Sequence, residues 1–462
     1  MSLSSIPERT TCAEHSKSNA TTDFDLVVVG FGTAGLSLAT ALADRGSKAN
    51  ILFLEKQGNF TWQPANVLPD STVRTSFLRD LITTRNPRSE FTFLNYLHET
   101  NQMVQFTNLS QLAPSRLVMG NYFAWVAERM VQRGWVWYGA DALRVNAVKN
   151  AQQQVSQWTI DVRDCGGETG SITSKRVVLA VGSKPRIPAS LASPGLTDHV
   201  LHSSACGSLL DNLRDQHIAI VGANQEAAEI FEHLQAAGAR HRVRATLFIP
   251  DSALRPEDNT PFLQDIVDDS NSILPPELRS RLLSTDAPSP HSCIALHTIE
   301  RLYDMQYTQR IQYSNPNDWR FRLESCSQVT SAQMTENGKL RLEFDNPRTG
   351  ATRTSSQAFD VVIAAGGYEY ELLPALLSSI SDAGLLEQRC LTVDKEYNVN
   401  LRRGALATGC GLWCLGSLEE GKIRDDVFTY AAERAQRCVG SVLAAMEVDP
   451  AGKVRVGEVA ML

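Results

Sequence analysis

A glycine-rich turn near the start of the chain constrains the fold more than any other feature of the sequence. The apolar run at residues 25–30 predicts a buried parallel strand, and it leads directly into Gly30-Phe-Gly-Thr-Ala-Gly35 and a run of helix-forming residues. A second apolar run at residues 50–55 predicts the next parallel strand, which completes a βαβ unit. The chain is therefore expected to fold as an α/β protein.

Each glycine of this turn has a physical role. Gly30 allows the tight turn, Gly32 lets the backbone approach a pyrophosphate, and Gly35 lets the helix pack close to the strand. The helix N-terminus offers free N–H groups and a partial positive charge to phosphates. Glu55, 20 residues past Gly35, can accept hydrogen bonds from ribose hydroxyls. The pattern favours a dinucleotide site over a glycine turn that binds no ligand.

A second copy of this pattern begins about 190 residues later. Residues 217–221 predict a strand, a turn follows at Gly222, a helix starts at Glu226, and residues 245–249 predict the next strand. The turn keeps only one of the expected glycines, and Glu226 places a negative charge where a phosphate would approach. Two such units indicate two nucleotide sites on two sheets. The alternative for the second unit is a βαβ fold with weak or altered cofactor binding.

Two further apolar runs that end in glycine are expected to extend the first sheet. They lie at residues 176–182 and 359–367, and both are expected to re-enter this sheet near the first nucleotide. The first domain is therefore expected in separate pieces of sequence, with the second domain inserted. Residues 268–292, rich in Ser, Pro and charge, predict a helix flanked by loops, and residues 1–22 predict a disordered tail.

Composition excludes several classes of protein. The 462 residues include 44 Lys and Arg against 51 Asp and Glu, and 43% of them are hydrophobic, as in an ordinary folded protein. The formal charge of −7, without a dense basic run, argues against nucleic-acid partners, and no apolar run is long enough for a membrane span. The nine scattered cysteines and the polar N-terminus favour reduced thiols, no metal site and a cytoplasmic location.

A run of thirteen residues, 86–98, is the most specific motif of the chain. Its sequence, Asn-Pro-Arg-Ser-Glu-Phe-Thr-Phe-Leu-Asn-Tyr-Leu-His, resembles the flavin-dependent N-hydroxylating monooxygenases, above all the fungal L-ornithine N-monooxygenases of siderophore biosynthesis. The similarity covers nearly the whole chain from about residue 25. Further motifs that carry it are Trp62-Gln63, Ser76-Phe77, Asp80-Leu81, residues 106–110, residues 251–256 and residues 258–262.

The resemblance implies two Rossmann-like dinucleotide-binding domains, one for FAD and one for NADPH, with a smaller substrate region. The implied FAD-binding domain covers residues 23–200 and returns with residues 346–462, which also contribute to the substrate region. The implied NAD(P)H-binding domain covers residues 201–345, with a substrate-region insertion near residues 262–312. The resemblance also implies a homo-oligomer, either a dimer or a tetramer.

Cofactor residues and chemistry follow from the same resemblance. FAD is implied at Gly30, Gly32, Gly35, Glu55 and Lys56, with Trp62 and Gln63 near the flavin. NADPH or NADH is implied at Gly222, Asn224 and Gln225, with Asp426 as a further cofactor-binding residue. The family's chemistry reduces FAD with NADPH, forms a flavin hydroperoxide with O2 and passes oxygen to a neutral amine. No catalytic side chain is therefore assigned.

Departures from the family pattern fall at the functional positions. A lysine that pairs with the substrate carboxylate is replaced by Thr72. The candidate replacement cations are Arg74, Lys422 and Arg424. Two asparagines that bind the amino acid are replaced by Gln264 and Pro290, and residues 425–430 lack the usual His-Gly-Leu-Ser pattern. The predicted substrate-binding residues are therefore Thr72, Arg74, Gln264 and Tyr430.

The nicotinamide side departs from the family as well. An arginine expected near the phosphate-bearing half of NADPH is replaced by Pro250, and Glu226 replaces a small hydroxyl residue. The two changes remove a favourable phosphate contact and add a repulsive charge. They predict weaker NADPH binding or a shift toward NADH.

These observations favour an FAD-dependent monooxygenase that N-hydroxylates a small amino acid or amine other than ornithine, with NAD(P)H and O2, in fungal secondary metabolism. One alternative is a flavin-dependent oxidase or other flavoenzyme that has lost NADPH use. A second is an L-ornithine N-monooxygenase of siderophore biosynthesis. A third is a nucleotide-binding protein without catalysis, because fold and motif do not determine chemistry.

Overall fold

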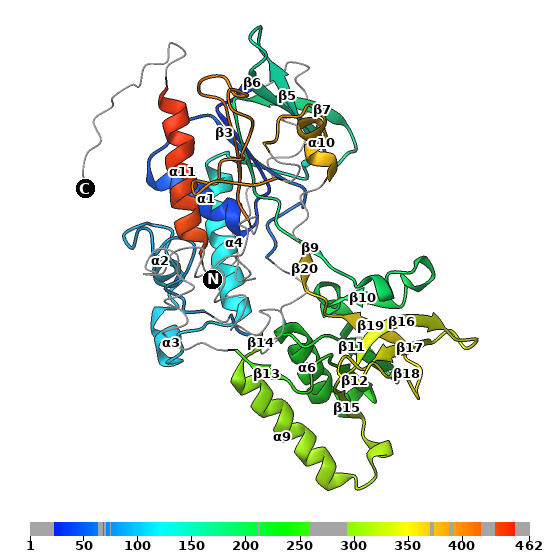
Figure 1. Cartoon of the computed structure of the whole chain (residues 1–462). Coiled ribbons are helices and arrows are strands. Elements are labelled where there is room, and N and C mark those ends of the chain that lie inside the picture. The colour runs from blue at the N-terminus through cyan, green and yellow to red at the C-terminus, as the bar shows by residue number, and fades with distance from the viewer. Residues whose placement is uncertain are drawn as a thin grey trace.

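Two α/β bodies make up the protein in this computed structural model. The first body lies at the top of Figure 1 and the second at the bottom, and the short strands β9 and β20 run side by side between them. Both bodies contain a parallel sheet, which confirms the predicted α/β fold. The structure describes residues 23–62, 68, 71–73, 75–210, 213–257, 293–369, 374–387, 391–416 and 430–448.

The first body is built on a five-stranded sheet with the order β21-β8-β2-β3-β4, in which every neighbouring pair is parallel. All four residues of β2 are buried, because helices α1, α4 and α11 cover one face of the sheet and a second sheet covers the other. The elements are β2 (Leu26–Val29), α1 (Thr33–Asp44), β3 (Ile51–Glu55), α4 (Arg116–Gln132), β4 (Val136–Tyr138), β8 (Arg176–Leu179), β21 (Gly411–Cys414) and α11 (Ala431–Glu447).

A four-stranded sheet with the order β1-β7-β6-β5 and helix α10 cover the other face. The Trp158 indole is buried there, and its Nε1 donates to the Gly411 carbonyl at 3.0 Å, which joins the two sheets. The elements are β1 (Asp23–Phe24), β5 (Asp141–Lys149), β6 (Val155–Arg163), β7 (Thr169–Ser174) and α10 (Pro374–Asp382).

The second body is built on a five-stranded parallel sheet with the order β10-β19-β11-β12-β15. The expectation that residues 359–367 re-enter the first sheet is wrong, because β19 pairs with β10 and β11. Residues 176–182 do contribute β8 to the first sheet, as expected. The elements are β10 (Val200–His202), β11 (His217–Val221), α6 (Gln225–His241), β12 (Arg244–Phe248), α9 (Leu296–Gln312), β15 (Phe321–Glu324) and β19 (Val361–Ala364).

The chain enters the second body after β9 and leaves it at β20, so this body includes β19, which lies beyond residue 345. The domain boundaries stay a prediction. None of the helices in the described ranges has the length and apolar character needed to cross a membrane.

Smaller elements complete the fold, among them the antiparallel strands β16, β17 and β18 beside the second sheet. Their bounds are β9 (Lys184–Pro185), β13 (Arg255–Pro256), β14 (Cys293–Ile294), β16 (Gln328–Met334), β17 (Leu340–Asp345), β18 (Thr352–Thr354), β20 (Tyr368–Glu369), α2 (Phe93–Glu99), α3 (Met103–Asn108) and α5 (Gly207–Leu210), with 3-10 turns at Ala189–Leu191, Pro194–Leu196, Ser203–Ala205 and Pro316–Asp318.

Candidate active site

The first glycine turn has the geometry of a dinucleotide site. Gly30 has a φ of +99°, and a Cβ atom there would lie 2.3 Å from the Ala180 carbonyl oxygen. A Cβ atom at Gly35 would lie 2.4 Å from the Gly30 carbonyl oxygen, so helix and strand approach too closely for a side chain. A Cβ atom at Gly32 would meet no described atom within 4 Å. The space in front of Gly32 is therefore open to a ligand.

Helix α1 starts at this open space. Gly32 is its N-cap residue and brings no side chain, so the first N–H groups of the helix are left for a ligand. A small cavity beside the helix start is lined by Ala34, Leu415, Gly416, Ala431, Arg434 and Ala435. Arg434 is the one cationic residue among the described residues that line this cavity, and an arginine there suits a pyrophosphate. No sequence motif identified this residue, because it lies in the first turn of an otherwise ordinary amphipathic helix.

Glu55 joins the end of β3 to the first glycine turn. Its carboxylate accepts hydrogen bonds from the Phe31 N–H and the Gln57 N–H, each at 2.9 Å. The remaining lone pairs are available to ribose hydroxyls, which is the predicted role of this residue. Burial and the nearby Glu55 charge raise the pKa of Tyr138 well above its usual value, so the phenol stays neutral. Lys56, which follows, is exposed.

Trp62 and Thr72 both lie against the N-terminal part of helix α4. The Trp62 ring packs edge-on against the Phe123 ring at 4.8 Å, and a Cβ atom at Gly120 would lie 3.6 Å from it. Thr72 pairs with Ser115, the N-cap residue of α4, in an isolated antiparallel bridge. The structure therefore brings a predicted flavin neighbour and a predicted substrate residue to the same helix.

Leu68, which lies between Trp62 and Thr72 in the sequence, contacts the second body. Leu68 is buried in the hydrophobic core of that body, in one cluster with Cys206 and Ala223. Because Ala223 belongs to the second glycine turn, Leu68 and this turn share a packing cluster. Four predicted site residues lie outside the described residues: Gln63, Arg74, Gln264 and Asp426.

Tyr430 is the N-cap residue of helix α11. The guanidinium carbon of Arg79 lies 5.8 Å from the centre of its ring, within the range of a cation–π contact. Helix α11 also lines the cavity at the start of α1. The Arg79 contact connects Tyr430 to the loop that follows Thr72, and helix α11 connects it to the first nucleotide turn.

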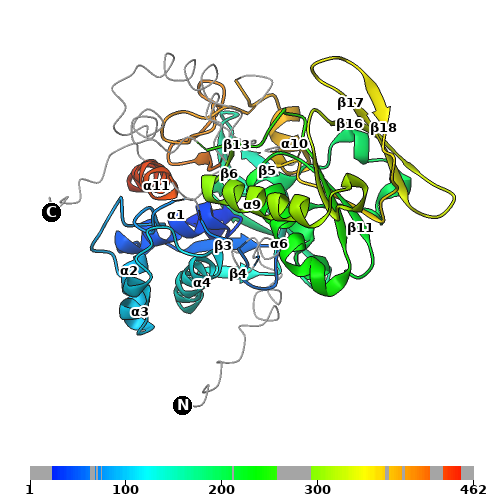
Figure 2. The ribbon, with the colours of Figure 1, turned by 90° about the horizontal axis from the view of Figure 1, so that it is seen from below.

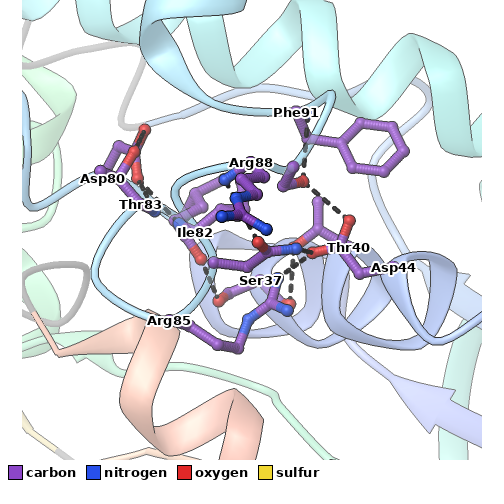
Figure 3. A network of polar contacts seen from close by, with 12 residues as sticks. Ser37, Thr40, Asp44, Asp80, Ile82, Thr83, Arg85, Arg88 and Phe91 are labelled. Atoms are coloured by element: carbon purple, nitrogen blue, oxygen red, sulfur yellow. Dashed lines mark hydrogen bonds and ion pairs between the residues drawn. The ribbon is translucent and has the colours of Figure 1, made fainter. Parts of the chain in front are cut away.

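That loop, which leads into the most specific motif of the sequence, is folded around a buried carboxylate (Figure 3). Asp80 accepts hydrogen bonds from the Ile82 N–H at 2.8 Å and the Phe93 N–H at 2.7 Å. It also accepts from the Thr83 hydroxyl at 2.7 Å. Burial raises the pKa of Asp80, and these hydrogen bonds oppose the rise. The carboxylate is thus satisfied within its own loop and has a structural role.

A buried ion pair fastens the same loop to helix α1 (Figure 3). Arg85 Nη2 lies 2.7 Å from Asp44 Oδ2, and the two side chains are only 7% and 8% exposed. The Ser89 hydroxyl donates to Asp44 at 2.7 Å, and the Ser37 hydroxyl donates to the Leu81 carbonyl at 2.8 Å. The motif that carries the family resemblance therefore positions a loop against the helix that follows the first glycine turn.

The second glycine turn also depends on a close approach of backbone segments. Gly222 has a φ of +149°, and a Cβ atom there would lie 2.6 Å from the Ala365 carbonyl oxygen. Asn224 donates to the same oxygen at 3.1 Å, and its Oδ1 accepts from the Ala227 N–H at 3.0 Å. Asn224 thus caps helix α6 with its own side chain, in contrast to Gly32 at the start of α1.

Gln225, the next residue, connects α6 to α9. Its side chain is buried, and its Oε1 accepts from the Ala295 N–H at 2.8 Å. Its amide nitrogen donates to Glu229 at 2.8 Å. Asn224 and Gln225 therefore have structural roles beside the predicted contact with a cofactor.

Glu226 lies at the start of α6 within a hydrogen-bonded cluster. Its carboxylate accepts from the Ser203 hydroxyl at 2.5 Å and from the Tyr368 hydroxyl at 3.2 Å. The Tyr368 ring packs edge-on against the His202 ring at 5.1 Å. These residues stand at or just after the carboxyl ends of β10, β11 and β19, where open parallel sheets bind nucleotides. The acidic group therefore lies at the nucleotide-binding edge of the second sheet.

The two turns differ in how they suit a phosphate group. The open space, the uncapped helix and Arg434 at the first turn fit the pyrophosphate of FAD. The second turn has the backbone geometry for a dinucleotide, but Asn224 uses a helix donor and Glu226 adds a negative charge. FAD held by Gly32, Glu55 and Arg434 would supply the redox chemistry with O2.

Two parallel sheets, each with a glycine turn at its carboxyl edge, are the architecture of oxidoreductases that bind two dinucleotides. The chain belongs to the L-lysine 6-monooxygenase/L-ornithine 5-monooxygenase family, whose model matches residues 22–370. It is therefore a flavin-dependent N-hydroxylating monooxygenase that uses FAD and NAD(P)H. The predicted family, enzyme class and cofactors are confirmed.

Similar proteins cover nearly the whole chain. The L-ornithine N(5)-monooxygenase of Ajellomyces capsulatus is 32% identical, over 92% of this chain and 92% of its own length. The L-ornithine N(5)-monooxygenase of Emericella nidulans is 31% identical, over 90% of this chain and 89% of its own length. The solved structure of ornithine hydroxylase (PvdA) from Pseudomonas aeruginosa has a TM-score of 0.81 at 27% identity, over 92% of this chain and 100% of its own length.

Proposed function

We propose that the enzyme hydroxylates the amine nitrogen of a small amino acid or amine other than L-ornithine, with O2 and NAD(P)H as co-substrates. Relatives named L-ornithine N(5)-monooxygenase support an amino acid or a compound of similar size as the substrate. The proposal that the substrate is not L-ornithine rests on Thr72. By the family resemblance, Thr72 occupies the position of a carboxylate-binding lysine. Removing one partner of a buried ion pair costs several kcal/mol, and a hydroxyl group brings no charge.

The proposed pocket lies near the start of α4. Thr72 is bridged to Ser115, and Trp62 packs one to two helix turns further along α4, near Gly120. A substrate bound at Thr72 would therefore reach toward the predicted flavin side of the site. Arg74, Gln264 and Tyr430 complete the proposed pocket, with Arg74 as the cation for a substrate that carries an acid.

The substitution Thr72→Lys tests this proposal. A new ammonium group would pair with the carboxylate of ornithine, so kcat/KM for ornithine should rise at least tenfold. Thr72→Met is the matched control, because it lengthens the side chain without adding charge. The measurement is hydroxylated product formed per NAD(P)H oxidised, over a panel of ornithine, lysine and their decarboxylated diamines. A wild-type enzyme that prefers ornithine, and loses this activity in Thr72→Lys, would contradict the proposal.

We further propose that NADH reduces the flavin at least as fast as NADPH does. Pro250 removes an expected phosphate-binding arginine, and the carboxylate of Glu226 stands at the start of α6. The measurement is anaerobic bleaching of the flavin absorbance after mixing with each nucleotide. Much faster bleaching by NADPH would contradict the proposed use of NADH. Bleaching by neither nucleotide would favour the alternative of a flavoenzyme that has lost NAD(P)H use.

A cytoplasmic location, a role in fungal secondary metabolism and assembly into a dimer or tetramer complete the proposed function. The dimer or tetramer can be tested on the purified protein, and one surface for it is argued next.

A further inference from the structure

Helix α9 presents an apolar stripe to the solvent. The helix lies along the lower edge of the second body in Figure 1, and in the view from below it runs across the front (Figure 2). Its large exposed side chains are each between 54% and 68% exposed: Leu296, Tyr303, Tyr307 and Ile311. Spacings of seven, four and four residues place these side chains on one face of the helix.

The opposite face of α9 is more polar than the exposed one. It buries Leu302 and Thr298 against the second body, but it also buries two glutamines. Gln306 and Gln309 donate to the Phe321 carbonyl oxygen at 3.2 Å and 2.7 Å. These hydrogen bonds fix the rotation of the helix about its own axis, so the apolar stripe stays on the solvent side. Large exposed apolar side chains gathered on one helix face are typical of a surface that contacts another protein.

The central part of the stripe, which includes Tyr303 and Tyr307, is complementary to itself in the antiparallel direction. Consider two antiparallel copies of α9 that cross at the level of Met305. Tyr303 of one copy then lies opposite Tyr307 of the other, because each tyrosine is two residues from Met305 along the helix. The exposed Glu300 and Arg310 both lie five residues from the centre, so each would face the opposite charge. A two-fold axis repeats every such pair, as expected of a homodimer contact.

We propose that α9 is the contact surface between two copies of this chain, packed antiparallel about Met305. The tyrosine side chains fill the centre, and the Glu300–Arg310 pairs flank them and determine the register. Arg310 is already ordered for this role, since its guanidinium carbon lies 5.6 Å from the centre of the Trp319 ring. The inference is independent of the substrate, and it goes beyond the proposed function.

The test uses the full-length, FAD-loaded protein in light scattering and sedimentation over a range of concentrations. The wild-type protein should form a dimer or a larger oligomer that contains this contact. Tyr303→Ser combined with Tyr307→Ser should raise the dissociation constant of this contact at least tenfold. The matched control is Val104→Ser with Leu117→Ser, two exposed apolar residues on α3 and α4 that lie away from the stripe. The control should leave the assembly unchanged.

A charge exchange then tests the register. Glu300→Lys should weaken the assembly, because it places two cations opposite each other, and adding Arg310→Glu to the same chain should restore it. Flavin absorbance and melting temperature show that each variant is folded. A monomeric wild type would overturn the proposal, as would an assembly that survives loss of both tyrosines. Failure of the double exchange to restore the assembly would overturn the antiparallel pairing.

Discussion

At the scale of single residues, the three glycines of the first turn are required for different reasons. Gly30 and Gly35 allow backbone segments to approach each other, since a Cβ atom at either would lie less than 2.5 Å from a carbonyl oxygen. Gly32 faces open space, so the fold does not require it. The pattern therefore combines two positions that serve the fold with one that serves the ligand.

This difference predicts separable effects of two similar substitutions. Gly32→Ala should leave the unfolding free energy of the apoprotein unchanged but weaken FAD binding at least tenfold, because the methyl group fills space in front of the helix N-terminus. Gly35→Ala should cost about 1–3 kcal/mol of stability through steric overlap with Gly30. Thermal melting of the apoprotein and fluorescence titration with FAD measure the two effects. Equal losses of stability would contradict the assignment of Gly32 to the ligand.

At the scale of elements, the sequence predicts both βαβ units correctly, because a short apolar strand, a glycine turn and a helix are local signals. It fails on β19, since a buried parallel strand looks the same in either sheet. The choice of sheet depends on long-range contacts, such as that between Gly222 and Ala365. The positions of Arg434 and Leu68 could not be predicted from the sequence for the same reason. Each contacts residues that are distant in sequence, and no local pattern marks it.

The first residue of β11 gives this body a pH-dependent stability. The His217 ring packs against Phe359 at 4.5 Å. Burial, with the charges of Arg244 and Arg322, lowers the pKa of His217 to about 4. The unfolded value is about 6.5, so between these values the unfolded chain binds more protons than the folded one. The contribution to stability is therefore complete above about pH 6.5 and is lost as the pH falls toward 4.

We expect His217→Gln to reduce the loss of folding stability at low pH. The wild-type protein should lose up to about 3 kcal/mol more stability than the variant between neutral pH and the folded pKa. Chemical denaturation at a series of pH values measures the difference, with thermal melting as a check on cooperativity. Parallel stability curves for the two proteins would show that His217 does not carry the effect.

At the scale of the whole molecule, the second nucleotide turn is connected to the ribbon between the two bodies. In this ribbon, the Arg186 N–H donates to the Gly367 carbonyl at 3.0 Å, and a ring nitrogen of His202 lies 2.9 Å from the same oxygen. The next residue, Tyr368, donates to Glu226. A nucleotide that approaches Glu226 therefore meets a group that is hydrogen-bonded to the ribbon between the two bodies.

Two substitutions separate the charge of Glu226 from its role in this connection. Glu226→Gln keeps an acceptor for Ser203 and Tyr368 but removes the negative charge at the start of α6. NADPH should then bind about tenfold more tightly, a gain of about 1.4 kcal/mol, with kcat changed less than twofold. Tyr368→Phe keeps the charge and removes one hydrogen bond, so it should bring no gain in affinity and should change the rate of flavin reduction instead. Nucleotide titration and stopped-flow reduction distinguish the two. A gain of the same size in Tyr368→Phe would show that the connection between the bodies, and not the charge of Glu226, limits binding at the second turn.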